Sequence, residues 1–114
     1  MRTVAEIRLE PEIRRALQAL REQATAEFEI RRIILYGSAA RGDTDEESDQ
    51  DVLALTRRPL TRADKDRISE IAFNINFEHG TNLSVLVIDE NAWDAGLYSV
   101  MPFHSEVLRD GVAV

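Results

Sequence analysis

The sequence lacks cysteine, and its basic residues are outnumbered by acidic ones. The absence of cysteine excludes disulfides and thiolate metal sites. There are 14 Lys and Arg residues against 21 Asp and Glu residues, so the formal net charge at pH 7 is −7. Proteins that bind nucleic acids use clustered Lys and Arg to release counterions from the phosphates. The charge balance therefore argues against a polynucleotide as the main ligand, whereas acidic residues would suit a site for a metal ion.

The sequence also lacks a long apolar run. No segment is apolar over the roughly 20 residues that a membrane-spanning helix needs, and the charged start at residues 1–6 does not have the pattern of a signal peptide. We therefore expect no membrane association and a cytoplasmic location. The 114 residues, 44% hydrophobic and 31% charged, have the size and composition of one globular domain, expected over residues 1–114.

The hydrophobic pattern predicts two long helices. The first begins at Pro11, a residue that the first turn of a helix accepts well, and it carries apolar residues at helical spacing on one side. These residues are Ile13, Leu17, Leu20, Ala24 and Phe28. The second helix is expected to begin after Thr61, with Asp64 as its capping-box partner, and to end at Gly80.

Three short apolar runs predict buried strands, at residues 33–36, 51–56 and 83–88. Shorter helical pieces are expected within residues 90–98 and 102–110. Helices and strands therefore alternate along the chain, which indicates a small α/β fold with helices packed against one sheet.

The segment from Gly37 to Asp51 carries the clearest chemical signal. A strand ends at Gly37-Ser38, where glycine allows a ligand close to the backbone and a following turn can direct N–H groups at phosphate. Asp49 and Asp51 stand two residues apart at the start of a strand, so both carboxylates are expected on one face. Unpaired carboxylates are costly in a core, but they are ligands that Mg²⁺ prefers.

A simpler interpretation exists for the acidic run, because charged runs are often solvated loops. We keep it for four of its members, namely Asp43, Asp45, Glu46 and Glu47. A calcium-binding loop starting at Asp43 is excluded, since the sixth position lacks glycine and the twelfth lacks an acid. Only Asp49 and Asp51 are assigned a role, because of the Gly-Ser and Arg-Gly residues that precede them.

These residues resemble a known signature. The pattern Gly37-Ser38-x-Ala40-Arg41-Gly42, followed by Ser48-Asp49-x-Asp51, resembles that of the minimal nucleotidyltransferases within the DNA polymerase beta-like superfamily. The resemblance implies an α/β (α+β) fold with a small mixed sheet flanked by helices.

The same resemblance implies the roles of individual residues. Asp49 and Asp51 are expected to be catalytic carboxylates that hold Mg²⁺ in a two-metal arrangement, with ATP or another nucleoside triphosphate as substrate. Gly37 and Ser38 are expected to contact the triphosphate, and Arg41 to help hold phosphate.

In this family a nucleoside monophosphate passes from the triphosphate to a hydroxyl group. Many members are antitoxins encoded beside a HEPN-domain toxin, and some add AMP to a tyrosine of that partner. The resemblance therefore implies AMP transfer from ATP, with a nucleoside triphosphate and a HEPN-domain protein as partners.

One feature of the family is missing. Active members usually carry a third carboxylate on the next strand, but residues 82–88 contain no acid: Asn82 and Ser84 are expected on one face, and Leu83 and Val85 on the other. General-base assistance contributes about 10²–10⁴ in rate, so a protein without this carboxylate would be a slow enzyme or none at all, and an alternative function stays open. The protein would then be a weak or inactive antitoxin that neutralises its partner by contact. Nearby acids that could substitute are Glu78, Asp89 and Glu90.

The remaining distinctive residues have structural interpretations. His79 stands at a helix end, where it is expected to interact with the terminal carbonyls, and His104 lies in no catalytic motif. Tyr36 is expected to serve packing. A late apolar cluster is expected in the core, with an exposed patch for self-association into a homo-oligomer or for a partner as the alternative. Its members are Trp93, Tyr98, Met101 and Phe103.

Overall fold

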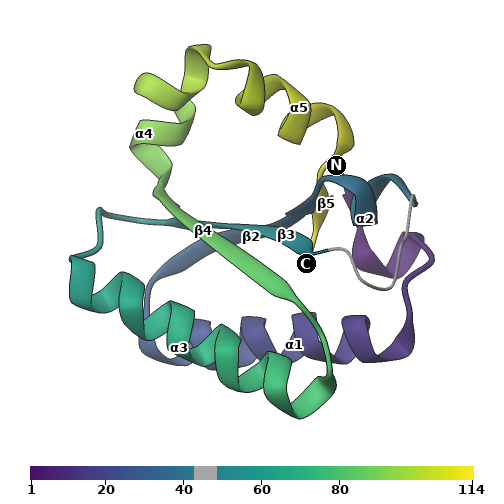
Figure 1. The fold of residues 1–114 in the computed structure, drawn as a ribbon. Coiled ribbons are helices and arrows are strands. Elements are labelled where there is room, and N and C mark those ends of the chain that lie inside the picture. The colour runs from purple at the N-terminus through teal and green to yellow at the C-terminus, as the bar shows by residue number, and fades with distance from the viewer. Residues whose placement is uncertain (43–48) are drawn as a thin grey trace.

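A computed structural model of the chain describes residues 1–42 and 49–114. It has three layers, with a β-sheet between two groups of helices (Figure 1). The long helices α1 (Pro11–Glu27) and α3 (Arg62–His79) cover one face of the sheet. The shorter helices α4 (Glu90–Asp94) and α5 (Pro102–Asp110) lie on the opposite face. The predicted α/β arrangement with helices packed against one sheet is confirmed.

The sheet has five strands in the order β1-β5-β2-β3-β4. Their bounds are Arg2–Thr3 for β1, Ile30–Tyr36 for β2, Gln50–Thr56 for β3, Leu83–Asp89 for β4 and Val112–Ala113 for β5. Strand β2 is antiparallel to β3 and β5, whereas β3 and β4 are parallel, as are β1 and β5. The sheet is therefore mixed, and β4 forms one of its edges.

The signals for the two long helices act as the sequence indicates. Pro11 is the first residue of α1. The Thr61 side chain accepts a hydrogen bond from the Asp64 backbone N–H at 3.1 Å and so caps the start of α3. Gly80 ends α3 in the left-handed conformation, with φ of 68°. Three short helical pieces complete the fold: α2 (Ser38–Arg41) and the 3₁₀ turns η1 (Val4–Glu6) and η2 (Leu97–Val100).

Each face of the sheet carries a hydrophobic core. On the α1 and α3 side, apolar residues of the two helices pack on the strands, and the most buried strand members are Leu35, Val52 and Val112. On the α4 and α5 side the core is smaller. It consists of Ile34, Leu53, Leu55, Ile88, Trp93 and Val107.

The late aromatic residues contribute mainly to the second core, which favours the packing interpretation. Trp93 is completely buried. Phe103 packs edge-on against Trp93, with ring centroids 5.6 Å apart, and against Tyr36 at 5.2 Å. Met101 is 38% exposed, and Tyr98 is partly buried. The packing role expected for Tyr36 is thus confirmed.

Two short strands and part of a third are not evident from the sequence. β1 and β5 have only two residues each, too few to show a hydrophobic period. β2 begins at Ile30, three residues before the apolar run that predicts it. The first part of the strand includes Arg31 and Arg32, which are exposed. Hydropathy alone does not mark such residues as strand.

The exposed edge of β4 is partly paired by a side chain. In this parallel ladder the Gln50 N–H donates to the Asn82 carbonyl at 2.9 Å, so the backbone groups of alternate residues starting at Leu83 point away from β3. The Leu83 N–H donates to Asn76 Oδ1 at 2.8 Å, and the Leu83 carbonyl accepts from Asn76 Nδ2 at 3.0 Å. The Asn76 amide thus pairs with Leu83 as a residue of a neighbouring strand would.

None of the helices formed by residues 1–42 and 49–114 combines the length and the apolar character needed to cross a bilayer.

Candidate active site

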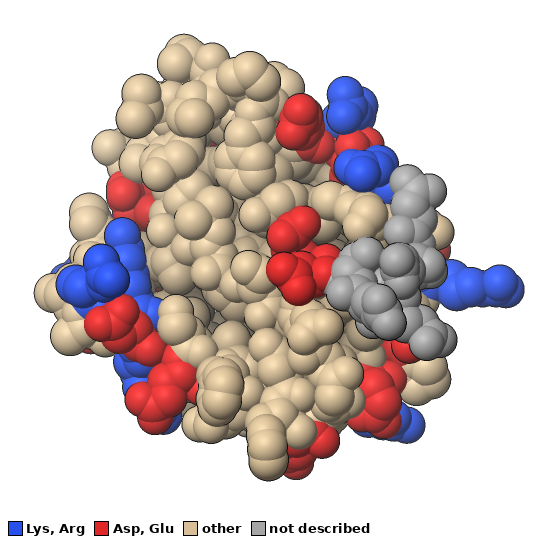
Figure 2. All heavy atoms as spheres, in the orientation of Figure 1, with Lys and Arg blue, Asp and Glu red and all other residues tan. Residues whose placement is uncertain are grey.

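The candidate site lies where β2 ends and β3 begins. Asp51 is paired in register with Tyr36 on β2 and with Ser84 on β4. Residues paired across neighbouring strands have their side chains on the same face of a sheet, so these three side chains share the face on which α4 and α5 pack. Figure 2 shows acidic side chains grouped near the centre of the surface that β4 crosses in Figure 1.

Gly37 and Asp51 are in close contact. A Cβ atom at position 37 would lie 2.7 Å from Asp51 Oδ2, closer than a side chain tolerates. The backbone of Gly37 has φ of 75° and ψ of −156°, a region almost restricted to glycine. The sequence predicts a close approach of the backbone to a ligand; in the structure the group that approaches Gly37 is the carboxylate of Asp51.

The two aspartates differ in their surroundings. Asp49 is exposed directly before β3, whereas Asp51 is partly buried on the strand. Burial raises the pKa of Asp51, and the negative charge of Asp49 raises it further. Burial, and secondly the charge of Asp51, also raises the pKa of Tyr36. Two carboxylates that repel each other are therefore held close together at this point of the sheet.

The donor set fits magnesium bound together with a phosphate ligand. Within the described ranges, no group of three or more His, Cys, Asp or Glu side chains is arranged to hold a metal ion. Two carboxylates are sufficient for Mg²⁺, which commonly takes one or two from the protein and the remaining oxygens from phosphate and water. Asp49 and Asp51 could supply these two.

The residues expected to contact the triphosphate lie at the start and end of α2, directly after β2. Ser38 is the first residue of α2 and is partly buried. Arg41 ends α2, and its Nη1 atom lies 3.8 Å from Asp110 Oδ2, which links α2 to the end of α5. Ser48 and the acidic residues interpreted as a solvated loop lie outside the described residues; the latter are Asp43, Asp45, Glu46 and Glu47.

Serine stands beside Asp51 on the strand where the resemblance leads us to expect a third carboxylate. Ser84 is exposed beside Asp51, while Asn82 precedes β4. Asp89 follows Ser84 by five residues and so lies about 17 Å farther along the strand. There it caps α4 by accepting a hydrogen bond from the Ala92 N–H at 3.0 Å, and its neighbour Glu90 pairs with Arg31. Asp89 and Glu90 therefore do not replace the missing acid.

Gln50 is a positioning residue that sequence reasoning did not identify. It stands between the two aspartates and is only 4% exposed. Its Oε1 atom accepts a hydrogen bond from the Asn82 N–H at 3.1 Å. Together with the backbone bond to the Asn82 carbonyl, this contact fixes the start of β4 relative to β3, which places Ser84 beside Asp51. Strand alternation, which turns residue 50 away from the face of Asp49 and Asp51, is the available sequence signal.

Both histidines have structural partners. His79 does not interact with the carbonyls at the end of α3 as expected; its Nδ1 atom lies 3.1 Å from Glu12 Oε2, which links α3 to α1. The ring of His104 packs on Trp93 with centroids 4.5 Å apart. Neither residue belongs to the group around Asp51.

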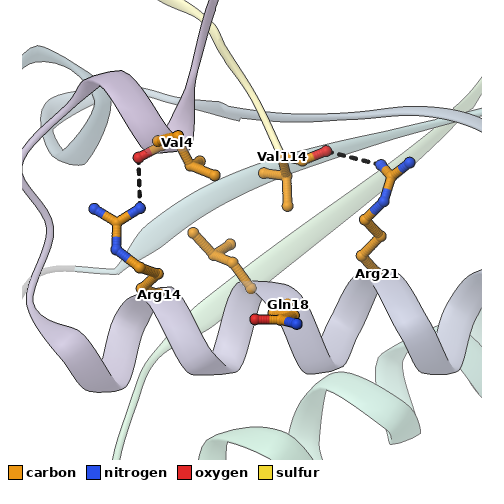
Figure 3. A pocket seen from close by; sticks show the side chains of 7 residues that line it. Val4, Arg14, Gln18, Arg21 and Val114 are labelled. Atoms are coloured by element: carbon orange, nitrogen blue, oxygen red, sulfur yellow. Dashed lines mark hydrogen bonds between the residues drawn. The ribbon is translucent and has the colours of Figure 1, made fainter.

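A separate cavity of about 340 Å³ lies between η1, α1 and the last residue (Figure 3). Two arginines that line it donate hydrogen bonds to backbone carbonyls. Arg14 donates to the Val4 carbonyl at 2.6 Å, and Arg21 donates to the Val114 carbonyl at 2.8 Å. These contacts attach η1 and Val114, which follows β5, to α1.

Comparison with known proteins finds a matching family model and similar sequences. The profile of a family described as nucleotidyltransferase domain matches residues 13–102. Two proteins of Methanocaldococcus jannaschii, each named "Putative protein adenylyltransferase", are similar in sequence. One is 43% identical over 56 residues, which cover 49% of this chain and 57% of that protein. The other is 32% identical over 82 residues, covering 72% and 75%.

Solved structures show the same fold. A "putative minimal nucleotidyltransferase" is 25% identical, with a TM-score of 0.56 over 88% of this chain and 94% of the other. A toxin–antitoxin crystal structure with AMP-PNP is 15% identical, with a TM-score of 0.62 over 91% and 72%. A "putative nucleotidyltransferase" from Sulfolobus solfataricus is 19% identical, with a TM-score of 0.52 over 95% and 89%. At the lower identities the similarity concerns the fold alone.

Proposed function

Because the chain belongs to the family of nucleotidyltransferase domains, we propose that it is a magnesium-dependent enzyme that transfers AMP from ATP to a hydroxyl group of a protein. The observation that carries this proposal is the pair Asp49 and Asp51 at the start of β3, with Asp51 in contact with Gly37 at the end of β2. Its relatives are named as protein adenylyltransferases, which supports a protein as the acceptor.

The proposed roles follow from position and chemistry. Asp49 and Asp51 hold magnesium, which when bound neutralises phosphate charge. Ser38 and the backbone at Gly37 contact the triphosphate, and Arg41 adds positive charge from the end of α2. The acceptor oxygen bonds to the α-phosphorus while the bond from that phosphorus to the pyrophosphate oxygen breaks. Pyrophosphate leaves, and the hydroxyl proton passes to Asp51 or to water.

The serine beside Asp51 limits the expected rate. A serine hydroxyl is no base near neutral pH, so the acceptor proton lacks the carboxylate that a third acid would supply. Since base assistance contributes about 10²–10⁴ in rate, we expect slow turnover. A slow enzyme is sufficient for one-time modification of a partner.

The partner that we propose is a HEPN-domain toxin, modified on a tyrosine. The fold shared with a toxin–antitoxin structure that contains AMP-PNP supports an assembly of this kind. Ser84 also favours a second candidate function, in which the chain neutralises its partner by contact without transfer. The variant Asp49→Asn/Asp51→Asn separates the two: an enzymatic antitoxin loses its effect on the partner, whereas a contact antitoxin keeps it.

The direct test is calorimetric titration of ATP with magnesium and with chelator. We expect binding only with magnesium, and an affinity at least about tenfold lower for Asp51→Asn, as is usual when support for a bound metal is removed. Asp94→Asn is the control, because Asp94 is exposed and pairs with Arg32 elsewhere on the surface. An ATP affinity that changes neither when magnesium is removed nor in Asp51→Asn would refute the proposed site.

A further inference from the structure

The edge strand β4 offers hydrogen-bonding groups next to the candidate site. Its odd-numbered residues direct backbone N–H and C=O groups away from β3, and Asn76 occupies those of Leu83. The sheet ends at β4, so the corresponding groups of Val85 and Val87 meet no other strand within the described parts of the chain. An edge of this kind is a template for an added strand.

A groove follows this edge between α3 and β4. It consists of two depressions of about 300 Å³ and 340 Å³ that share Ser69 and Val85. The first reaches Phe73 and Ser84, and the second reaches Tyr98 near η2. The surface that β4 crosses is largely uncharged over a broad area, as Figure 2 shows in the orientation of Figure 1.

One end of the groove carries an exposed aromatic side chain, and the other end carries charged side chains beside Leu86. Phe73 is 68% exposed and lines the first end, and Phe77 lies one helical turn away on α3 and is 86% exposed. Leu86 on β4 is 41% exposed and lines the second end. The lining of the second end also includes Lys65 and Arg62, the latter paired with Asp66 at 3.2 Å. Apolar side chains in the middle of a bound segment, with an acidic residue beside Lys65, would complement this lining.

The groove also reaches the candidate site. Ser84 lines it and is the register partner of Asp51. A strand added at β4 would lie about 5 Å from β4 and about 10 Å from β3. A hydroxyl group on that strand can reach Asp51 only if it is carried by a long side chain that passes over residue 84. The small side chain of Ser84 leaves space for such a side chain.

We propose that this groove binds an extended segment of the acceptor protein. The segment pairs with the backbone of Val85 and Val87 as an added strand, rests apolar side chains on Phe73 and Leu86, and places an acidic residue beside Lys65. Its hydroxyl-bearing side chain then crosses Ser84 toward Asp51. This inference rests on the proposed function, since it assigns where that reaction recognises its acceptor.

The test uses a library of nine-residue peptides with tyrosine fixed at the centre and all other positions randomised. The full chain is incubated with the library, magnesium and ATP labelled at the α-phosphate. We expect labelled peptides to be enriched in apolar residues within a few positions of the tyrosine and in Asp or Glu toward one end. Labelling without any positional preference would overturn the proposal.

Two variants examine the contacts separately. Val85→Pro/Val87→Pro removes the two outward N–H groups, which an edge strand tolerates, and should reduce labelling at least about tenfold, the loss that 1.4 kcal/mol produces. Val85→Thr/Val87→Thr keeps the N–H groups and the side-chain shape, so it is the matched control. Lys65→Glu should reverse the preference for acidic residues, and Arg15→Glu on α1 should not. Unchanged labelling by the proline variant would contradict strand addition.

Titration of ATP and the thermal midpoint distinguish the possible failures. If the proline variant does not fold, the Lys65→Glu result decides. A chain that binds ATP with magnesium but labels no peptide overturns the groove as the acceptor site. A chain that binds no ATP overturns the proposed function itself, and the docking proposal with it.

Discussion

Ser84 and Asp51 occupy paired positions on adjacent parallel strands, with both side chains on the same face of the sheet. This pairing is fixed by Gln50, whose side chain and backbone both bond to Asn82 at the start of β4. The site is therefore built to place the side chain of residue 84 beside the Asp51 carboxylate. The residue type at position 84 therefore determines how many carboxylates surround the proposed magnesium ion.

Restoring the third acid should accelerate transfer. In Ser84→Asp the new carboxylate stands beside Asp51, where it can accept the hydroxyl proton, so we expect labelling of the acceptor to rise by about 10²-fold. Ser105→Asp is the control, because Ser105 is exposed on α5 and lines neither depression of the groove. Initial rates at saturating ATP and magnesium provide the measurement. An equal response of the two variants would show that the position beside Asp51 has no special role.

The ionised carboxylate of Asp51 should destabilise the protein in the absence of metal. Its pKa is raised in the folded chain, chiefly by burial, so ionisation at neutral pH opposes folding. Asp51→Asn removes this charge and should raise the melting midpoint of the metal-free protein, which scanning calorimetry measures.

The same prediction has a defined pH dependence. Because the folded pKa of Asp51 lies above the unfolded one, the opposing contribution is fully present above the folded pKa. It is lost as the pH falls through that value and then below the unfolded one. The difference in midpoint between wild type and Asp51→Asn should therefore shrink on acidification. A difference that grows toward low pH would contradict this sign.

Gly37→Ala should disturb both folding and the site. The added Cβ would lie 2.7 Å from Asp51 Oδ2, and the backbone conformation is one that alanine rarely adopts. We expect a loss of about 2–4 kcal/mol in unfolding free energy and weaker binding of ATP. Gly80→Ala is the matched control: its φ is also positive, but no atom lies within 4 Å of the added Cβ. Chemical denaturation and calorimetry of both variants separate backbone strain from contact with Asp51.

Gln50→Leu should loosen the junction between β3 and β4. The substitution removes the acceptor of the Asn82 N–H, and an unpaired N–H that is partly buried costs about 1–3 kcal/mol. The exposed Gln18 on α1, whose amide bonds to Glu22, provides the control substitution Gln18→Leu, expected within about 0.5 kcal/mol of wild type. Equal denaturation midpoints for the two variants would show that the Gln50 contact is dispensable.

Much of the fold could be predicted because its long elements carry strong local signals. The period of α1, the cap at Thr61 and the stop at Gly80 all appear in the structure. The two-residue strands β1 and β5 could not be predicted, since they exist only through pairing between distant parts of the chain. The order of the strands, which makes β4 an edge, is likewise a tertiary property.

The candidate site likewise has features that local sequence predicts and features that depend on how distant strands pair. The motif identifies Asp49, Asp51 and Gly37, and strand alternation places the two carboxylates on one face. The contact between Gly37 and Asp51 depends on the register of β2 with β3, which residue types do not encode locally. The anchoring role of Gln50 depends in the same way on where β4 begins.

The Asn76 amide has a consequence for solubility. A seven-residue edge strand rich in valine and leucine is the kind of segment that seeds intermolecular sheets and aggregates. Asn76 occupies both outward backbone groups of Leu83. The part of β4 that a strand from another molecule can pair with is therefore shorter than β4 itself. The side chain that lines the start of the groove between α3 and β4 should thus also reduce self-assembly at high concentration.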